Sequence, residues 1–373
     1  MDPALVVDCG SSICRGGFAG EESPHTVFPS VVGVSRKRGI FRARTPGARL
    51  AETFVGYEAY RNRLNLALSS PMDQGKIVNW DYMEKILHHM FIEQLRVPSS
   101  DYRVLMTEYP FANPTDTQKM AQLMFEGFNA LGISIFLRPL LSLYATGRTT
   151  GLVIQTGASN TYTVPISGGT ALKFNIMQRS FGNGADVTSY LYTLLRNRGQ
   201  FLGDTRADDP IFKDIKEKCC AVAPANAELE FPSSYLLPDG NTLDIESMQR
   251  KCTECMFQPS LIGKEGAGVH QMANHSIIRC NKEIRSILFS NIVIAGGNSL
   301  FRGFSERIQQ ELKLLAPTQS VEVVNPVERH HLSWLGGSMI ANLPSFEDLC
   351  VSKQEYEEIG PNVIRKFKHE LPL

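Results

Sequence analysis

The 373-residue sequence has no excess of charge of either sign, because 38 Lys and Arg residues balance 38 Asp and Glu residues. No overall electrostatic field therefore marks the chain as a binder of nucleic acid or membranes, and any charged partner has to be recognised by a local patch. Apolar residues never run on for the roughly 20 positions that a membrane-spanning helix needs. The first residues lead into an apolar segment without a basic leader, so we expect no signal peptide.

Paired cysteine motifs with metal-binding spacing are also lacking. The eight cysteines are scattered, which predicts reduced, mostly buried thiols rather than a disulfide framework. Cys252 and Cys255 form one CxxC motif, but a structural zinc site needs about four ligands and no second pair is evident. His88 and His89 are neighbours on a predicted helix, where adjacent side chains point in different directions. We interpret them as ordinary surface and core histidines.

A chain of 373 residues exceeds the size of a single hydrophobic core, which predicts two or more lobes. Asp81 is the predicted N-cap of a helix, since apolar residues follow it at helical spacing. Residues 104–106 are predicted to form a buried strand, and a second amphipathic helix is predicted after Asn113 and Pro114. Helices alternating with strands indicate the α/β class.

Two stretches share a strand-turn-strand pattern, at residues 5–18 and 151–166. Each turn is rich in small residues, and such turns expose backbone N–H groups that bind anions. This repetition suggests an internal duplication in which each lobe offers one loop to a shared ligand. A predicted strand at 292–294 then meets Gly296 and Gly297, a weaker sign of a nucleotide site.

Short segments spread over the chain resemble the actin family in order and spacing. They are GFAG at 17–20, WDYMEKI at 80–86, LSLYATGRTTG at 141–151, DIKEK at 214–218, FQPSLIG at 257–263, WLGGS at 334–338 and KQEY at 353–356. The resemblance implies the α/β actin fold, a two-lobed nucleotide-cleft fold shared with Hsp70 chaperones and sugar kinases. Its first lobe would comprise residues 1–145 and 336–373, with an outer subdomain at about 30–70. The second would comprise 146–335, with an outer subdomain at about 183–272.

The resemblance also implies an adenine-nucleotide site, for ATP or ADP, with a weakened site for Mg²⁺. Asp8 matches the family's metal-associated acid, which acts through water. The matching nucleotide-binding residues are Asp8, Gly10, Ser11, Ser12, Arg15, Gly157, Ser159, Lys216, Glu217, Gly296, Gly297, Asn298 and Leu300. Arg15 stands where most actins have lysine, and its planar fork does not replace an ammonium point for point.

Four catalytic positions of the family are changed in this sequence. Gln155 and Ala158 stand in place of acids, and Arg138 and Tyr162 in place of the glutamine and histidine that position the attacking water. We therefore expect weakened magnesium binding and no efficient ATPase activity. The alternative is that Arg138 supplies positive charge to phosphate in place of the metal and sustains slow turnover.

Two surfaces are relevant to the binding of partner proteins. Residues 36–49, which match the family's apolar intersubunit loop, are dense in arginine and have no acids. They form either a solvated loop or a contact for an acidic partner, a microtubule or nucleic-acid surface, although nucleic acid lacks support from interleaved aromatics. The match to the family's apolar partner groove comprises Tyr144, Gly147, Thr149, Ile340 and Leu343. Core packing is the competing interpretation of Tyr144 and Leu343.

These observations lead to one preferred function and two alternatives. The preferred one is a divergent actin-related structural subunit of a cytoskeletal or axonemal assembly in the cytoplasm, with nucleotide as a largely structural ligand and other actin-family or cytoskeletal proteins as partners. The first alternative is an actin-type ATPase that forms dynamic filaments; a kinase or chaperone is disfavoured because the matching segments are those of actin. The second is a chromatin-remodelling scaffold subunit, ranked lower because the chain lacks sizeable insertions.

Overall fold

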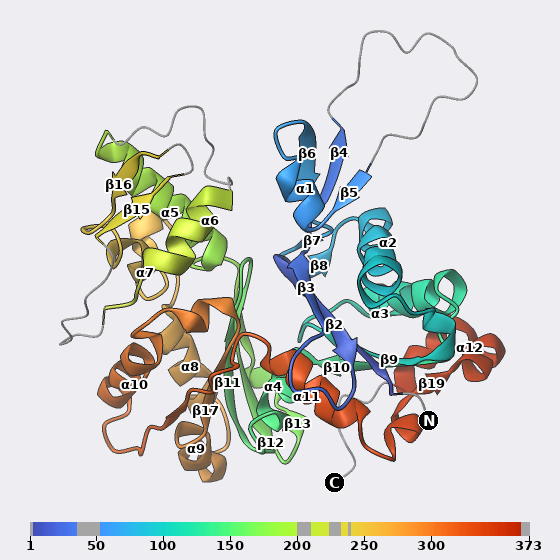
Figure 1. The fold of residues 1–373 in the computed structure, drawn as a ribbon. Helices are drawn as coiled ribbons and strands as arrows, with labels where there is room; N and C mark the ends of the chain where they lie inside the picture. Colours follow the sequence, from blue (N-terminus) through green and yellow to red (C-terminus); the bar gives the residue numbers. More distant parts are fainter. Residues whose placement is uncertain (1–2, 36–52, 200–209, 224–232, 238–239, 367–373) are drawn as a thin grey trace. The chain divides into compact units, whose positions relative to one another are not determined.

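A computed structural model describes residues 3–35, 53–199, 210–223, 233–237 and 240–366 (Figure 1). The chain folds into two compact units. Unit 1 spans Met1–Leu141 and Ser333–His369, and unit 2 spans Ser142–Leu332. The chain passes from one unit to the other within helix α4 (Arg138–Tyr144) and returns within α11 (Leu332–Ala341). The arginine-dense residues 36–49 lie outside the described residues.

The main sheet of unit 1 has the strand order β19-β10-β9-β1-β2-β3. Its strands are β1 (Leu5–Cys9), β2 (Ile13–Phe18), β3 (Thr26–Pro29), β9 (Arg103–Glu108), β10 (Gly132–Leu137) and β19 (Val351–Ser352). A three-stranded sheet, β5-β4-β6, and a pair, β7-β8, lie in the same unit. These strands are β4 (Val32–Ser35), β5 (Thr53–Val55), β6 (Leu66–Ser69), β7 (Met72–Asp73) and β8 (Lys76–Ile77).

The remaining helices of unit 1 are α1 (Tyr57–Arg61), α2 (Trp80–His88), η1 (His89–Leu95), η2 (Ser99–Asp101), α3 (Pro114–Gln122), η3 (Leu123–Gly127), η7 (Phe346–Leu349), α12 (Lys353–Ile359) and η8 (Gly360–Lys366). Met83, Ile86 and Leu87 of α2 are buried, as their spacing predicts. The predicted cap is wrong. Asn79, not Asp81, caps α2, and its side chain accepts a hydrogen bond from the Tyr82 N–H.

The main sheet of unit 2 has the order β13-β12-β11-β17-β18, and β14 also pairs with β12. Its strands are β11 (Gly151–Thr156), β12 (Thr161–Ser167), β13 (Thr170–Ala171), β14 (Met177–Arg179), β17 (Ile292–Ala295) and β18 (Val323–Val324), with a separate pair β15 (Ser234–Leu236) and β16 (Thr242–Asp244). The helices are η4 (Lys173–Asn175), α5 (Gly184–Asn197), α6 (Pro210–Cys219), α7 (Lys251–Glu254), η5 (Pro259–Ile262), α8 (Val269–Ile278), α9 (Lys282–Phe289), η6 (Gly297–Leu300) and α10 (Phe304–Leu315).

The two main sheets repeat one topology. In unit 1, β1 pairs antiparallel with β2 and parallel with β9, which pairs parallel with β10. In unit 2, β11 pairs antiparallel with β12 and parallel with β17, which pairs parallel with β18. Both predicted hairpins are therefore present, and the α/β class is confirmed. The second turn comprises residues 157–160, because β11 continues to Thr156, opposite Thr161.

Unit 1 is completed by the C-terminal part of the chain. The buried indole of Trp334 donates a hydrogen bond to the Val6 carbonyl at 3.0 Å. Gly336 packs so closely that a Cβ there would lie 1.9 Å from the carbonyl oxygen of Leu141, which only glycine allows. α11 thus lies directly on backbone of its own unit.

All eight cysteines are free thiols; seven are buried and Cys350 is partly buried, in agreement with the sequence. Cys252 and Cys255 lie in the core of unit 2, where the Cys255 thiol donates to the Cys252 carbonyl. His88 is exposed and His89 is half-buried, packed against Phe28. Across the described part of the chain, no helix combines the length and apolar character that a membrane crossing requires.

Candidate functional site

The predicted first phosphate loop belongs to unit 1 and follows β1. Because β1, β9 and β10 are parallel neighbours, their carboxyl ends meet at one edge of the sheet. Asp8, Thr107 and Arg138 lie at or just beyond those ends. Open parallel sheets bind their ligands at this edge. The topology thus gathers the polar residues where a ligand is expected.

The carboxylate of Asp8 is held between two guanidinium groups. Arg138 Nε lies 3.0 Å from Oδ1 and Arg15 Nη1 lies 3.5 Å from Oδ2. Thr107 also donates to Oδ1, at 2.7 Å. Burial by itself would raise the pKa of Asp8, but Arg138, Arg15 and the Thr107 hydrogen bond together lower it below the ordinary value. Asp8 is therefore an ionised carboxylate at neutral pH, paired with two cationic side chains.

Arg138 is 5% exposed and fixes the start of the first loop. Its Nη2 donates to the Cys9 carbonyl, its Nε donates to Thr107 Oγ1 at 3.0 Å, and the guanidinium stacks 4.3 Å from the Tyr109 ring centre. Arginine stays protonated in proteins and accepts no hydrogen bond, so it does not act as a general base. In this arrangement Arg138 positions Asp8 and the loop.

The first loop turns its carbonyl groups toward unit 1 itself. The Ser11 carbonyl accepts from Ser70 Oγ at 3.1 Å, and the Ser12 carbonyl accepts from the Ser30 N–H at 2.9 Å. In a trans peptide the C=O and N–H groups point in opposite directions. The N–H groups of Ser12 and Ile13 are therefore directed away from these partners, as in the backbone concavities that bind anions.

The second loop, in unit 2, is held in the same way, through hydrogen bonds to its carbonyl groups. Three consecutive carbonyls, those of Gly157, Ala158 and Ser159, accept from the Gly184 N–H (3.0 Å), the Ala185 N–H (2.9 Å) and Asn183 Nδ2 (2.9 Å). The peptide N–H groups that follow each carbonyl therefore point away from helix α5. Both hairpins thus present backbone N–H groups from a scaffold tied down by their own carbonyls.

Two other segments of unit 2 lie beside the second loop and the start of α5. Asn298 Nδ2 donates to the Gly157 carbonyl at 2.7 Å, which ties η6 to the hairpin. The buried ammonium of Lys216 donates to the Gly184 carbonyl at 3.0 Å, in the first turn of α5. Gly296 has φ +91°, and a Cβ there would lie 2.3 Å from the Thr156 carbonyl oxygen, so glycine is required. The structure therefore brings Gly157, Lys216 and Asn298 into one neighbourhood.

Other predicted residues lie apart from these contacts. Glu217 is exposed, 4.0 Å from Lys213 Nζ on the same helix. Gly297 and Leu300 are exposed on η6. Of the changed catalytic positions, Gln155 and Tyr162 face each other across the β11–β12 ladder, and Ala158 is half-buried in the second turn.

The predicted partner groove draws on both units. In unit 2, Tyr144 is buried, with its hydroxyl 3.4 Å from the Gly169 carbonyl oxygen, and burial raises its pKa to about 12. Gly147 and Thr149 are exposed there. In unit 1, Ile340 is buried and Leu343 is 42% exposed. Interior packing thus describes Tyr144 and Ile340, while Leu343 is available to a partner.

Sequence reasoning missed the residues that support the loops. Thr107 binds both Asp8 and Arg138, and Asn183 caps α5 while holding the second loop. A signal for Asn183 exists in the sequence, because Asn183 and Asp186 have the spacing of a capping box, which marks a helix start. The role of Thr107 depends on strand register and has no local signal.

Two α/β units repeat one sheet topology, and each carries a hairpin loop whose carbonyls are held by its own unit, which defines a duplicated α/β protein. The sequence model of the family described as Actin matches residues 2–368, nearly the whole chain. The chain belongs to the actin family. Members of this family generally bind adenine nucleotide with Mg²⁺.

The residues of this chain fit the nucleotide better than the metal. Hydrated Mg²⁺ is held by carboxylates that remain available to its water shell. Asp8 instead is buried and paired with Arg15 and Arg138, and positions 155 and 158 carry no charge. The donor set therefore does not suit a divalent cation at this loop.

Lys216 leads to a pH-dependent prediction. Burial lowers its pKa from the ordinary value to about 8, against a smaller opposing effect of Glu217. Between pH 8 and the ordinary pKa of about 10.4, the unfolded chain binds more protons at this site than the folded chain, so stability rises with pH. Lys216→Met should remove this increase and raise stability at pH 7. Urea midpoints of both proteins at pH 7, 8.5 and 9.5 test it; a parallel pH dependence would contradict it.

Asn160, in the second loop, is 3% exposed, and neither polar atom of its side chain has a hydrogen-bond partner among the described residues. An unsatisfied buried polar group costs about 1–3 kcal/mol. Asn160→Val should therefore stabilise the nucleotide-free protein by about that amount, measured as a rise in the urea midpoint. The matched control is Thr161→Val, which removes a paired hydroxyl from the same hairpin and should lower it. A lower midpoint for Asn160→Val would contradict the prediction.

Proposed function

We propose that this actin-family chain holds adenine nucleotide as a largely structural ligand, with weak or no hydrolysis, within a cytoskeletal or axonemal assembly. The observation that carries the proposal is the clamping of Asp8 between Arg15 and Arg138. Two guanidiniums and one carboxylate leave a net positive charge beside the first loop. Such a loop suits a polyphosphate without a metal of its own.

Each unit contributes binding and orientation through its own residues. In unit 1, the N–H groups that follow the Ser11 and Ser12 carbonyls would donate hydrogen bonds to phosphate oxygens. Arg15 would supply positive charge. In unit 2, the second loop would do the same, and Lys216 and Asn298 would support its geometry from behind. Mg²⁺, where bound by relatives, screens phosphate charge and orders water. Arg138 and Tyr162 stand where the family has the pair that positions an attacking water.

The direct test is extraction of ligand from the native protein, followed by chromatography. ATP or ADP should be recovered at close to one per chain, and the Kd for ADP should change less than about fivefold between EDTA and excess Mg²⁺. Folded protein that yields no adenine nucleotide would overturn the binding proposal. A much larger effect of Mg²⁺ would overturn the metal-poor site while leaving nucleotide binding intact.

The assembly role is supported by family membership and by the exposed Leu343 of the predicted groove. Partners would be other actin-family or cytoskeletal proteins in the cytoplasm.

We expect no long homopolymers under salt and magnesium conditions, because the arginine-dense residues 36–49 cannot provide an apolar intersubunit contact. Pelleting and electron microscopy separate the alternatives: abundant pure filaments favour the dynamic ATPase, and co-purification with chromatin remodellers favours the scaffold.

A further inference from the structure

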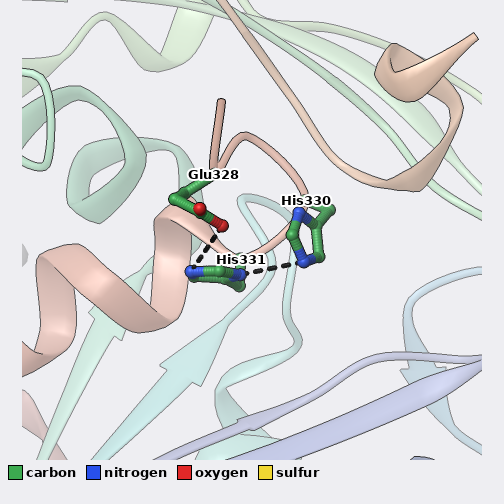
Figure 2. A group of neighbouring side chains, drawn as sticks. All are labelled: Glu328, His330 and His331. Atoms are coloured by element: carbon green, nitrogen blue, oxygen red, sulfur yellow. Dashed lines mark hydrogen bonds and ion pairs between the residues drawn. The ribbon is translucent and has the colours of Figure 1, made fainter. Parts of the chain in front are cut away.

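A cluster of metal-ligating side chains lies in unit 2, between β18 and α11. Glu328, His330 and His331 each place one ligand atom within 4.8 Å of the others. Figure 2 shows the ring of His331 between its two neighbours, with one nitrogen toward each. His331 Nε2 lies 3.3 Å from Glu328 Oε2, and His331 Nδ1 lies 3.0 Å from His330 Nε2.

The backbone beneath the cluster is firmly held. The His331 N–H donates to the Glu328 carbonyl at 3.0 Å, which closes a turn. Arg329 anchors this turn to the glycine-rich segment, since its carbonyl accepts from the Gly296 N–H at 2.9 Å and its Nε donates to the Ser299 carbonyl at 2.9 Å. The Arg329 guanidinium is thus directed to carbonyl groups. The three side chains are therefore presented from a fixed turn.

The chemistry of the three groups is selective. Two imidazoles and one carboxylate suit Zn²⁺ and similar transition metals, whereas Mg²⁺ and Ca²⁺ prefer all-oxygen sites. With metal–ligand bonds of about 2.0–2.1 Å, tetrahedral ligands stand about 3.3 Å apart. The nitrogen of His331 that binds the ion therefore already lies at about the right distance from one partner, 3.0 Å from His330 or 3.3 Å from Glu328. The three ligand atoms all lie within 4.8 Å of one another, so the remaining ligand has to move closer.

One ion can use only one nitrogen of His331, so one of the two present contacts must be replaced on binding. The side chain of Glu328 is 50% exposed and free to reorient, whereas that of His331 is 6% exposed and fixed. Adjacent histidines seldom meet in this way on a helix, but here they lie in a turn just before α11.

The geometry points to a site for one divalent transition metal, with Zn²⁺ as the reference ion, formed by Glu328, His330 and His331 and completed by water. Three protein ligands and an open position are a common zinc arrangement. Through Arg329, the bound ion would stiffen the turn that carries Gly296. This inference does not depend on nucleotide binding, because every ligand belongs to the Glu328–His331 turn.

The test is calorimetric titration of the full chain with Zn²⁺, in chelator-free buffer containing a phosphine reductant. We expect one site per chain, weakened more than about tenfold by His330→Gln and by Glu328→Gln. His88→Gln is the matched control, since His88 is an exposed histidine in unit 1, and its affinity should equal that of the unmodified protein.

Cobalt spectroscopy separates this site from the thiols. A Co²⁺ adduct of imidazole and carboxylate lacks a thiolate-to-metal charge-transfer band, and we expect none. A strong thiolate band, an unmodified protein that binds no Zn²⁺, or variants that bind as tightly as the unmodified protein would each overturn the assignment. Circular dichroism of each variant checks that the fold is retained.

Discussion

Replacing Asp8 by asparagine should destabilise the nucleotide-free protein by about 3–5 kcal/mol, the cost of leaving a buried charge without its partner. Asp8 is the carboxylate that both Arg15 and Arg138 contact, and the Arg138 side chain is 6% exposed. Asparagine keeps the shape and the hydrogen bond to Thr107 but leaves two guanidiniums facing each other. The measurement is the urea midpoint of unfolding, detected with a probe in unit 1.

The matched control for this variant is Glu84→Gln, which neutralises an exposed acid on α2 of the same unit. Its effect should stay within about 0.5 kcal/mol. The double variant Asp8→Asn with Arg138→Gln should recover part of the loss, because it removes one stranded cation; the recovered part measures the coupling. If Asp8→Asn unfolds at the same urea midpoint as the control, the Asp8–Arg15–Arg138 cluster does not stabilise the folded protein. The proposed clamping of Asp8 would then be wrong.

The largest gain of activity is expected from restoring four positions together. Arg138→Gln, Gln155→Asp, Ala158→Asp and Tyr162→His in one protein should raise single-turnover hydrolysis of bound ATP by about 10²-fold or more, the scale of one well-placed electrostatic group. Arg138→Gln releases Asp8 from one guanidinium. The acid at 155 and the histidine at 162 would face each other across the hairpin. Phosphate release from a preloaded complex is the measurement.

Each single change should do little, because groups that position one water and one phosphate act as a unit. Arg138→Gln alone is the informative control, since it tests whether freeing Asp8 suffices. A single variant that restores full activity would show that the other positions are not limiting. An unmodified protein that already hydrolyses ATP as fast as the restored variant would show that Arg138 carries a catalytic role.

The sequence predicted the parts of the fold that depend on local pattern. The hairpins at β1–β2 and β11–β12 follow from short apolar runs around small-residue turns, and the buried face of α2 follows from its spacing. The start of α2 was wrong because Asn79 and Asp81 are equally good caps. A non-local contact favours Asn79 as the cap, because the N–H groups of Val78 and Asn79 both donate to the Pro71 carbonyl.

For the site, residue types were predictable but their pairing was not. Arg138 was considered as a partner of phosphate, yet it contacts Asp8 and the Cys9 carbonyl, 129 residues away in sequence. That contact is created by the register of three parallel strands, which no local pattern encodes. The orientation of the loop carbonyls toward Ser30, Ser70 and helix α5 is non-local for the same reason.

The return of the chain to unit 1 has a consequence for synthesis on the ribosome. Val6 emerges early, but the Trp334 indole that binds its carbonyl lies 328 residues later, and β19 joins the same sheet later still. Unit 1 therefore cannot close its sheet until unit 2 has been translated in full. Until then β10 keeps an open edge, and open edges in nascent chains invite aggregation. Productive folding of this protein should depend on a chaperone that shields the unfinished half, and slow release from the ribosome should lower the yield.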